Sequence, residues 1–348
     1  MLFARKLQIL ALFALTIVGL IVLSLPRQPQ LLLLTYGAQK QQAPIHPPPQ
    51  NVVGALGQVS NEALAGQPTE RELSASKAMR LSKIRGKAED KLEPKGSKIV
   101  LLTGTDGKGH NNAITNLMET VQANREEYCA YHDYKYVFMN LTKHVTPGRH
   151  PVWAKIPAIQ EALDLNPTAE WVWWLDTDAI IMTPEIDLAS HVLNPEVLKT
   201  RIACDRPIRL PNGKPSGLKM SCNVDVSMID IIVGQDHHGV NAGSILFRRN
   251  EWSMAFLDMW ADPMYINQRF ERQEQDVLNH IIVNHPKIRE HVAIVPQRVI
   301  NAYSVGGSDM GWVTGDLVVH FAGCWVNSEC NERWQDFWNR RRVVKATG

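Results

Sequence analysis

A run of apolar residues that ends in two carboxylates constrains this chain more than any other feature. Residues 171–175 include three tryptophans, and Asp176, Thr177 and Asp178 follow directly. Such a continuous apolar run predicts a strand buried on both faces, as in a parallel sheet covered by helices. Because side chains alternate along an extended chain, Asp176 and Asp178 should point to the same side. The two carboxylates can therefore share one ligand.

Two neighbouring carboxylates repel each other unless a cation lies between them. Hard divalent ions such as Mg²⁺ and Mn²⁺ prefer oxygen ligands, so the pair predicts a metal site that holds a diphosphate. A structural turn is the alternative, because Asp-x-Asp is frequent by chance. A second apolar run, residues 179–182, follows the pair. Carboxylates that enter a core need a partner, which favours the metal site.

The N-terminus carries a membrane signal. Residues 7–25 are apolar except for a few small or polar positions, and Arg5 and Lys6 precede them. The run is long enough to span a bilayer as a helix. No small-x-small cleavage site follows it, so we expect an uncleaved signal anchor rather than a cleaved signal peptide. The flanking charges predict a cytoplasmic tail, residues 1–6, and a lumenal remainder.

Residues 26–96 are rich in proline and glutamine and poor in aromatic residues, as in a stem or linker. The globular part is expected at residues 97–348. It opens with a strand, a glycine-rich turn at residues 106–112 and a helix at residues 113–132, a layout that places nucleotides at the carboxyl ends of parallel strands. The turn lacks the P-loop pattern, and a plain strand-helix connection is the alternative.

Charge and cysteine content narrow the function classes. The net charge is +2 and no strongly basic block occurs, so we expect no nucleic-acid partner. Five cysteines are too few and too scattered for a zinc ribbon. In a lumenal compartment we expect a disulfide between Cys204 and Cys222, or between Cys324 and Cys330, because each pair flanks a loop-like segment. The odd number leaves one thiol unpaired.

Further polar residues are candidates for the site. Lys155 begins a predicted helix among apolar neighbours, where an ammonium could neutralise a leaving diphosphate; a surface lysine is the alternative. His320 ends a predicted late strand, where Mn²⁺ would accept an imidazole; a core histidine is the alternative. Gly243 permits close backbone approach to a sugar, and Asn241 offers amide donors and an acceptor.

Six short segments together resemble one enzyme family, glycosyltransferase family 34, which comprises fungal galactosyltransferases and mannosyltransferases. They are residues 153–157 (WAKIP), 173–178 (WWLDTD), 241–244 (NAGS), 248–250 (RRN), 274–276 (EQD) and 320–324 (HFAGC). The resemblance covers roughly residues 97–340. It implies a GT-A fold, that is, an α/β class Rossmann-like α/β/α sandwich with a mostly parallel sheet, behind an N-terminal transmembrane helix and a stem. It also implies a retaining, Mn²⁺-dependent hexosyltransferase anchored in the Golgi membrane as a single-pass type II protein.

The resemblance also implies roles for single residues. The metal ligands would be Asp176, Asp178 and His320. The catalytic group would comprise Gln275 facing the anomeric carbon, with Glu274, Asp276 and Lys155. The donor-binding positions would be Thr103, Gly104, Asp106, Asn241, Gly243 and Gly323. From the residues alone, Glu274 and Asp276 are equally explained as partners of a helix dipole. Plant relatives carry more acidic residues in this motif, so no single nucleophile is assigned.

The identity of the expected sugar donor rests on residues 105–111. The sequence of this run looks closer to the α-1,6-mannosyltransferase branch of the family. That branch implies transfer from GDP-mannose to the oligomannose outer chain of N-glycans, together with other mannosyltransferase subunits. UDP-galactose is the alternative nucleotide sugar. A non-catalytic subunit that retains the fold is another alternative. A glycosidase is disfavoured, because hydrolysis needs an acid and a base across the scissile bond.

Overall fold

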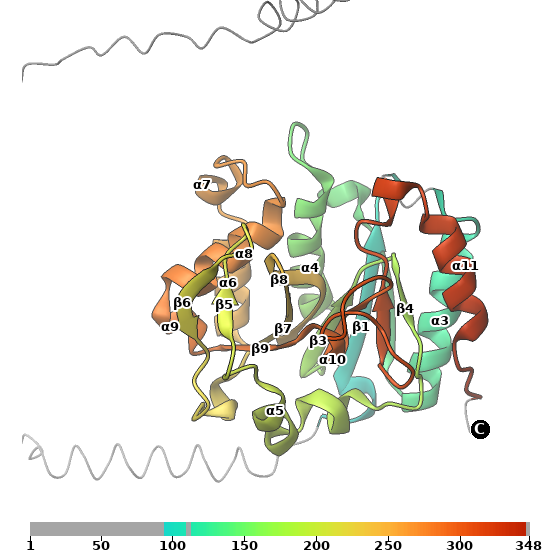
Figure 1. The fold of residues 1–348 in the computed structure, drawn as a ribbon, viewed down its shortest axis with the longest axis horizontal. Coiled ribbons are helices and arrows are strands. Elements are labelled where there is room, and N and C mark those ends of the chain that lie inside the picture. The colour runs from blue at the N-terminus through green and yellow to red at the C-terminus, as the bar shows by residue number, and fades with distance from the viewer. Residues whose placement is uncertain (1–93, 109–112, 346–348) are drawn as a thin grey trace, which may run out of the picture. The chain divides into compact units, whose positions relative to one another are not determined.

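A six-stranded sheet forms the centre of the computed structural model, which describes residues 94–108 and 113–345 (Figure 1). In spatial order the strands are β2 (Lys135–Asn140), β1 (Ile99–Thr105), β3 (Trp171–Leu175), β8 (Gly239–Arg248), β7 (Ile231–Asp236) and β9 (Val292–Pro296). Within this sheet β8 runs antiparallel to both neighbours, and the other neighbouring pairs are parallel. The sheet is therefore mixed. A tight turn joins β7 to β8, and a hairpin forces the second strand to reverse.

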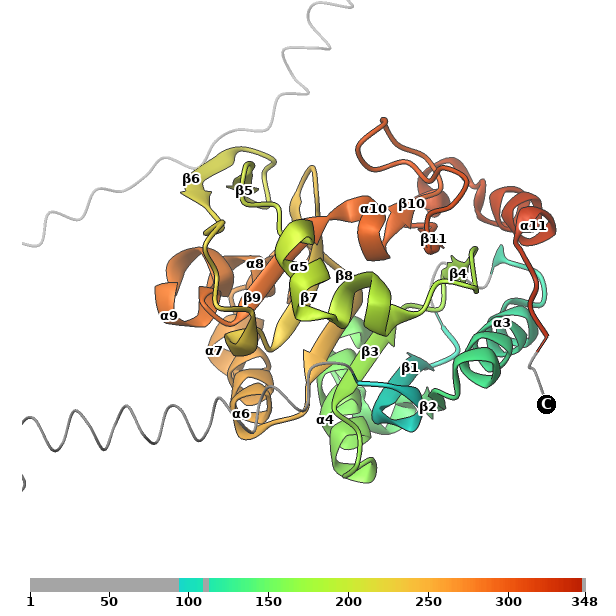
Figure 2. The ribbon, with the colours of Figure 1, turned by 90° about the horizontal axis from the view of Figure 1, so that it is seen from below.

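Helices cover both faces of this sheet (Figure 2). On one face lie α4 (Lys155–Leu165), α6 (Glu251–Trp260), α7 (Pro263–Ile266), α8 (Gln273–Asn284) and α9 (Pro286–Arg289); on the other lie α3 (Leu117–His132), α5 (Pro195–Arg201) and α10 (Gln297–Ile300). The predicted α/β layering is confirmed. The predicted helix at residues 113–132 begins later, at Leu117, because Asn116 adopts a left-handed backbone conformation that a right-handed helix excludes.

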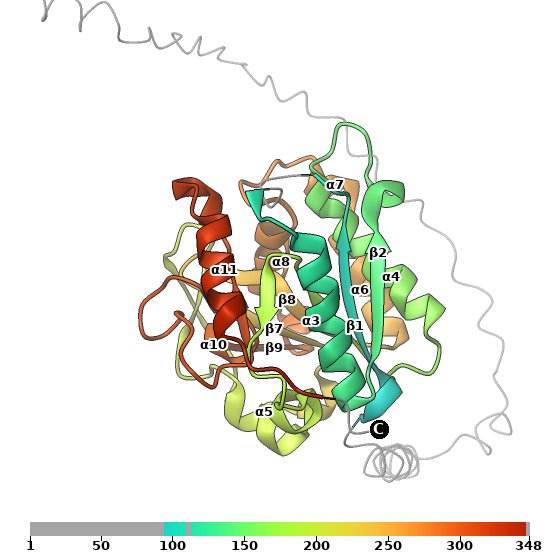
Figure 3. The same cartoon turned by 90° about the vertical axis from the view of Figure 1, so that its right-hand side faces the viewer.

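A three-stranded sheet packs beside the central one and consists of β10 (Ala302–Tyr303), β11 (Val318–His320) and β4 (Ala179–Ile181). In the antiparallel pairing of β11 with β4, His320 lies opposite Ala179, one residue after Asp178. Figure 3 shows α11 (Cys330–Arg340) and α3 on either side of β4. A separate hairpin is formed by β5 (Pro207–Arg209) and β6 (Pro215–Lys219).

The core confirms the central expectation from the sequence. All five residues of β3 are buried, and Trp173 and Leu175 have no exposed surface. Both expected disulfides, Cys204–Cys222 and Cys324–Cys330, are present, and Cys129 is a buried free thiol.

The membrane prediction falls on a part of the chain that the structure does not describe. Within residues 94–108 and 113–345, no helix has the length and apolarity needed to cross a membrane. The predicted tail, the predicted anchor at residues 7–25 and the stem up to residue 93 lie outside those ranges. So do residues 109–112 of the predicted glycine-rich turn.

Candidate active site

The two carboxylates lie in the turn that leads from β3 to β4. The turn is bonded to a neighbouring strand on each side: the Asp176 amide donates to the Gly243 carbonyl at 2.8 Å, and the Phe321 amide donates to the Asp178 carbonyl at 2.8 Å. The side chain of Asp176 accepts a further hydrogen bond from the Trp174 indole. Strand β8 and the segment after β11 therefore fix the position of both carboxylates.

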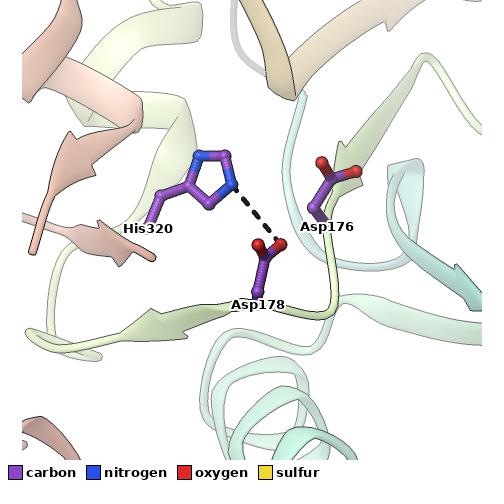
Figure 4. A group of neighbouring side chains, drawn as sticks. All are labelled: Asp176, Asp178 and His320. Atoms are coloured by element: carbon purple, nitrogen blue, oxygen red, sulfur yellow. Dashed lines mark ion pairs between the residues drawn. The ribbon is translucent and has the colours of Figure 1, made fainter. Parts of the chain in front are cut away.

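Asp176, Asp178 and His320 form one cluster (Figure 4). One ligand atom from each residue lies within 4.8 Å of the others, and the His320 Nε2 atom is 3.4 Å from Asp178 Oδ1. Neighbouring ligands of an octahedral ion with bonds of about 2.1 Å are about 3 Å apart, so this spacing fits a divalent ion after a small adjustment. Two carboxylate oxygens with one imidazole nitrogen fit Mn²⁺. The structure thus brings together the three residues predicted as metal ligands.

The charges of this cluster also favour a cation. Burial lowers the pKa of His320, but the Asp178 carboxylate outweighs burial and raises that pKa above its usual value. Burial raises the pKa of Asp178, and the His320 charge outweighs it and lowers that pKa. A metal ligand must be an unprotonated imidazole. We therefore expect a bound divalent ion to take the place of the His320 proton.

Gly243 makes room for His320. A Cβ atom at position 243 would lie 2.3 Å from His320 Cε1 and 2.8 Å from its Nδ1, far inside van der Waals contact. Any side chain at this position would therefore displace the imidazole. In the structure this glycine lets a metal-ligand candidate approach, and the approach of a sugar to its backbone stays a prediction.

Lys155 is buried, so the alternative of a surface lysine is wrong. Its side chain is 7% exposed, and its ammonium donates to the Ala242 carbonyl at 2.9 Å and to Glu274 Oε1 at 3.1 Å. The same nitrogen lies 3.2 Å from Asp176 Oδ1. These contacts match the three donors of an ammonium. Burial lowers the pKa of Lys155, but the carboxylates of Asp176 and Glu274 outweigh it and raise that pKa, so the ion pair persists.

The three consecutive residues at the start of α8 serve three different partners, because a helix turns about 100° per residue. Glu274 faces Lys155, and Gln275 Oε1 accepts from the Ala242 amide at 3.1 Å. Asp276 turns back and accepts from the Arg272 amide at 2.9 Å, as a partner of the helix N-terminus would. Gln275 is thus the member of the motif without a charged partner, and it bonds the residue before Gly243, the glycine that packs against His320.

Comparison with known proteins agrees with this geometry. The chain matches the galactosyl transferase GMA12/MNN10 family over residues 95–331. It belongs to this family of glycosyltransferases.

Two relatives in Schizosaccharomyces pombe are named probable alpha-1,2-galactosyltransferases. One is 38% identical and the match covers 72% of this chain and 73% of the relative; the other is 36% identical over 72% and 75%. A probable alpha-1,6-mannosyltransferase of Saccharomyces cerevisiae is 32% identical over 60% of this chain and 55% of the relative.

The positions expected to bind the family's donor divide into buried and accessible ones. Thr103 donates from its hydroxyl to the Leu175 carbonyl at 3.0 Å, and a Cβ at Gly104 would collide with Leu141. Asn241 bonds Tyr303, Asn301 and the Gly243 amide. These three residues have partners inside the protein, and their role in donor binding stays a prediction.

Asp106 and Gly323 lie at partly exposed positions. Asp106 accepts from the Lys108 amide at 3.0 Å, at the start of the glycine-rich turn. Gly323 has a φ of 75°, which glycine adopts without strain, directly before the disulfide-bonded Cys324. Both residues remain predicted donor contacts.

Arg125 is a residue of the site that the sequence analysis missed. It is fully buried in α3, and its Nη2 atom donates to the carbonyls of Asp176 at 3.1 Å and Ala179 at 2.8 Å. Burial lowers its pKa to about 10. Val121, Arg125 and Tyr128 follow helical spacing on one buried face, and this pattern would have indicated an arginine that enters the core.

Asn124 completes this contact. Its amide donates to the Ile181 carbonyl at 3.0 Å, and its Oδ1 accepts from the Ile181 amide at 2.8 Å and from the Arg125 guanidinium. Helix α3 thus bonds the backbone at Asp176 and after Asp178. We call Asn124 and Arg125 the α3 clamp.

Proposed function

We propose that this chain is a metal-dependent, retaining galactosyltransferase that moves galactose from UDP-galactose to a mannose-containing glycan. The observation that carries the proposal is the cluster of Asp176, Asp178 and His320 in a member of this glycosyltransferase family.

The choice of donor rests on the relatives. The proteins named alpha-1,2-galactosyltransferases match with higher identity and over more of both chains than the one named alpha-1,6-mannosyltransferase. This favours UDP-galactose, the alternative from the sequence, over GDP-mannose, which residues 105–111 had favoured. The acceptor expectation, an oligomannose-type glycan, is unchanged.

Retention of configuration is implied by the family resemblance, and the partners of the two carboxylates favour direct attack by the acceptor over a covalent intermediate. Glu274 is paired with Lys155, and Asp276 is bonded to the Arg272 amide, so neither offers a free nucleophile. Gln275 can contact the face of the sugar opposite the diphosphate without forming a bond. The acceptor hydroxyl then attacks on the face from which the diphosphate leaves: the C1–O bond to the diphosphate breaks, the bond to the acceptor oxygen forms, and the acceptor proton passes to the departing diphosphate.

The three metal-ligand candidates act on the leaving group of this reaction, the diphosphate. A divalent ion held by Asp176, Asp178 and His320 would stabilise the negative charge that develops on the diphosphate. Lys155 and the Trp174 indole hold Asp176 in place before the donor binds, so little reorganisation is needed during the reaction. Lys155 is therefore a positioning residue in this proposal.

The proposed cellular setting is a GT-A type catalytic domain in the Golgi lumen behind a signal anchor. Three observations support it: the apolar run at residues 7–25, the N-glycosylation sequon Asn140-Leu141-Thr142 and the two disulfides. Disulfides persist in oxidising compartments and are rare in the cytosol. Association with other transferase subunits remains part of the proposal.

The test is a panel of nucleotide sugars. The purified chain is incubated with Mn²⁺, an α-linked mannose oligosaccharide and either UDP-galactose, GDP-mannose or UDP-glucose, and product is measured by mass. We expect the highest kcat/KM with UDP-galactose. Turnover with GDP-mannose alone would contradict the donor assignment, and no turnover with any of the three would favour a non-catalytic subunit.

A further inference from the structure

A polar pocket opens at the carboxyl ends of β7 and β9. Its volume is about 120 Å³, several times the roughly 10–15 Å³ that one water molecule needs on the same measure. Asp236 ends β7, and Pro296 ends β9, and both line it. Since β3 runs in the same direction as these two strands, the pocket and the metal cluster lie at the same edge of the sheet, where α/β proteins bind their ligands. We call it the β7–β9 pocket.

The lining of this pocket fits an uncharged polar ligand. Two arginines, Arg206 and Arg209, are balanced by two aspartates, Asp236 and Asp309. Neither an anion nor a cation would meet a surplus of opposite charge. Guanidinium groups donate hydrogen bonds and carboxylates accept them. These four side chains can therefore bind hydroxyl groups, which both donate and accept. Met310 adds an apolar surface for the carbon side of a sugar ring.

A short chain of contacts joins the pocket to the metal cluster. The Tyr303 hydroxyl donates to the Asp236 carboxylate, and the Asn241 amide donates to the Tyr303 oxygen at 2.7 Å. Asn241 Oδ1 then accepts from the Gly243 amide at 3.0 Å, and Gly243 packs against the His320 imidazole. The pocket therefore lies a few side chains from the place where the donor sugar reacts.

One wall of the pocket is held rigidly. Asp309 and Met310 belong to the loop between β10 and β11. Arg298 bonds both carboxylate oxygens of Asp316 in this loop, at 2.9 and 3.0 Å, and also donates to the Ser308 carbonyl at 3.1 Å. A bidentate arginine–carboxylate pair fixes both distance and orientation. The wall is thus formed before a ligand arrives.

We propose that the β7–β9 pocket is the acceptor subsite, which binds a neutral hexose residue of the acceptor glycan next to the donor. This assignment rests on the proposed function, because it takes transfer to a sugar acceptor as given. Asp309 and Arg206 are the best residues for a test, since both are exposed and their loss leaves no buried group unpaired.

The experiment measures acceptor and donor constants separately for the full chain. Asp309→Ala and Arg206→Ala should each raise the acceptor KM at least tenfold for an α-linked mannose disaccharide, with the UDP-galactose KM within twofold of the parent. Asp164→Ala is the matched control: Asp164 is exposed near the end of α4, about 14 Å along the helix from Lys155 at 1.5 Å per residue. It should change neither constant. An unchanged acceptor KM in both pocket variants would overturn the assignment.

Direct binding separates this inference from the proposed function. Saturation-transfer NMR with methyl α-mannoside, in the presence of UDP and Mn²⁺, reports acceptor binding without turnover. If the parent transfers no sugar, the proposed function fails, but binding that is lost in the Asp309→Ala/Arg206→Ala double variant still supports the pocket. Equal saturation transfer in the parent and the double variant would contradict it.

Discussion

At the scale of single residues, the candidate metal centre depends on Gly243, which has no side chain and so leaves room for the His320 imidazole. Gly243→Ala should push the His320 imidazole out of the cluster, because the added Cβ would lie 2.3 Å from His320 Cε1. We expect the Mn²⁺ concentration for half-maximal activity to rise at least tenfold. The control is the double variant with His320→Ala, which should be no worse than His320→Ala alone, since both changes remove the same ligand. Additive losses would show that Gly243 acts elsewhere.

Lys155 makes a second prediction at this scale. Lys155→Met keeps the length of the side chain but leaves the buried Glu274 carboxylate without its partner, which costs about 3–5 kcal/mol. The melting temperature should fall by several degrees. Lys155→Met/Glu274→Gln should recover part of that loss, and Lys287→Met, at an exposed lysine, should have no effect. An undisturbed melting temperature in Lys155→Met would mean that the ion pair contributes no stability.

Some residues of the site could be predicted from the sequence, and the surroundings of others could not. Asp176 and Asp178 could be predicted because two carboxylates directly follow an apolar strand, although the structure places them in a turn and not on an extended strand. The surroundings of Lys155 could not, because its partners Glu274 and Ala242 come from elements more than 80 residues away along the chain. Contacts of that kind depend on how strands and helices are ordered in space.

At the scale of elements, α3 acts as a clamp on the turn that carries the carboxylates. Arg125→Lys keeps the charge but loses the guanidinium fork that reaches the Asp176 and Ala179 carbonyls together. A buried carbonyl without a partner costs about 1–3 kcal/mol. We expect a lower melting temperature and a lower kcat at saturating Mn²⁺.

A purely structural role for Arg125 would give a different outcome. In that case the variant would melt earlier but keep its kcat and its Mn²⁺ requirement at a temperature where it is folded. Arg333→Lys is the matched control, since Arg333 pairs with Glu329, four residues before it in the same segment.

The elements themselves were predicted unevenly. Strand β3 was foreseen because five apolar residues in succession need burial on both faces. The reversed direction of β8 was not, because it depends on the hairpin turn between β7 and β8, and Gly239 there adopts a φ of 106° that the apolar pattern does not reveal. The predicted mostly parallel sheet is therefore present with one reversed strand, β8.

At the scale of the whole molecule, the reactivity of the cysteines tests the two disulfides and the burial of the free thiol. The five cysteines form two disulfides and one buried thiol, and burial raises the pKa of Cys129 to about 12. A thiol reagent requires the thiolate. We expect no labelling of the native protein at pH 8 and one labelled thiol per chain after denaturation without reductant. Three or more labelled thiols would contradict the disulfide assignment.

The β7–β9 pocket could not be predicted from the sequence. Its walls come from the β5–β6 region, the end of β7 and the loop between β10 and β11, which are separated by many residues. The family resemblance, in contrast, followed from short motifs that each keep their own local pattern. The sequence therefore indicated the chemistry of the site more completely than its shape.

The central claim is that Asp176, Asp178 and His320 hold the ion on which transfer depends. The most direct measurement is a Mn²⁺ titration of UDP-galactose turnover for the parent and for Asp176→Asn, Asp178→Asn and His320→Ala, with melting temperatures recorded alongside. Loss of several kcal/mol of leaving-group stabilisation should lower kcat by orders of magnitude in the Asp variants, since each ~1.4 kcal/mol is a factor of ten, while the variants stay folded. Full parent activity in EDTA, or an Asp178→Asn variant that turns over like the parent, would contradict the account.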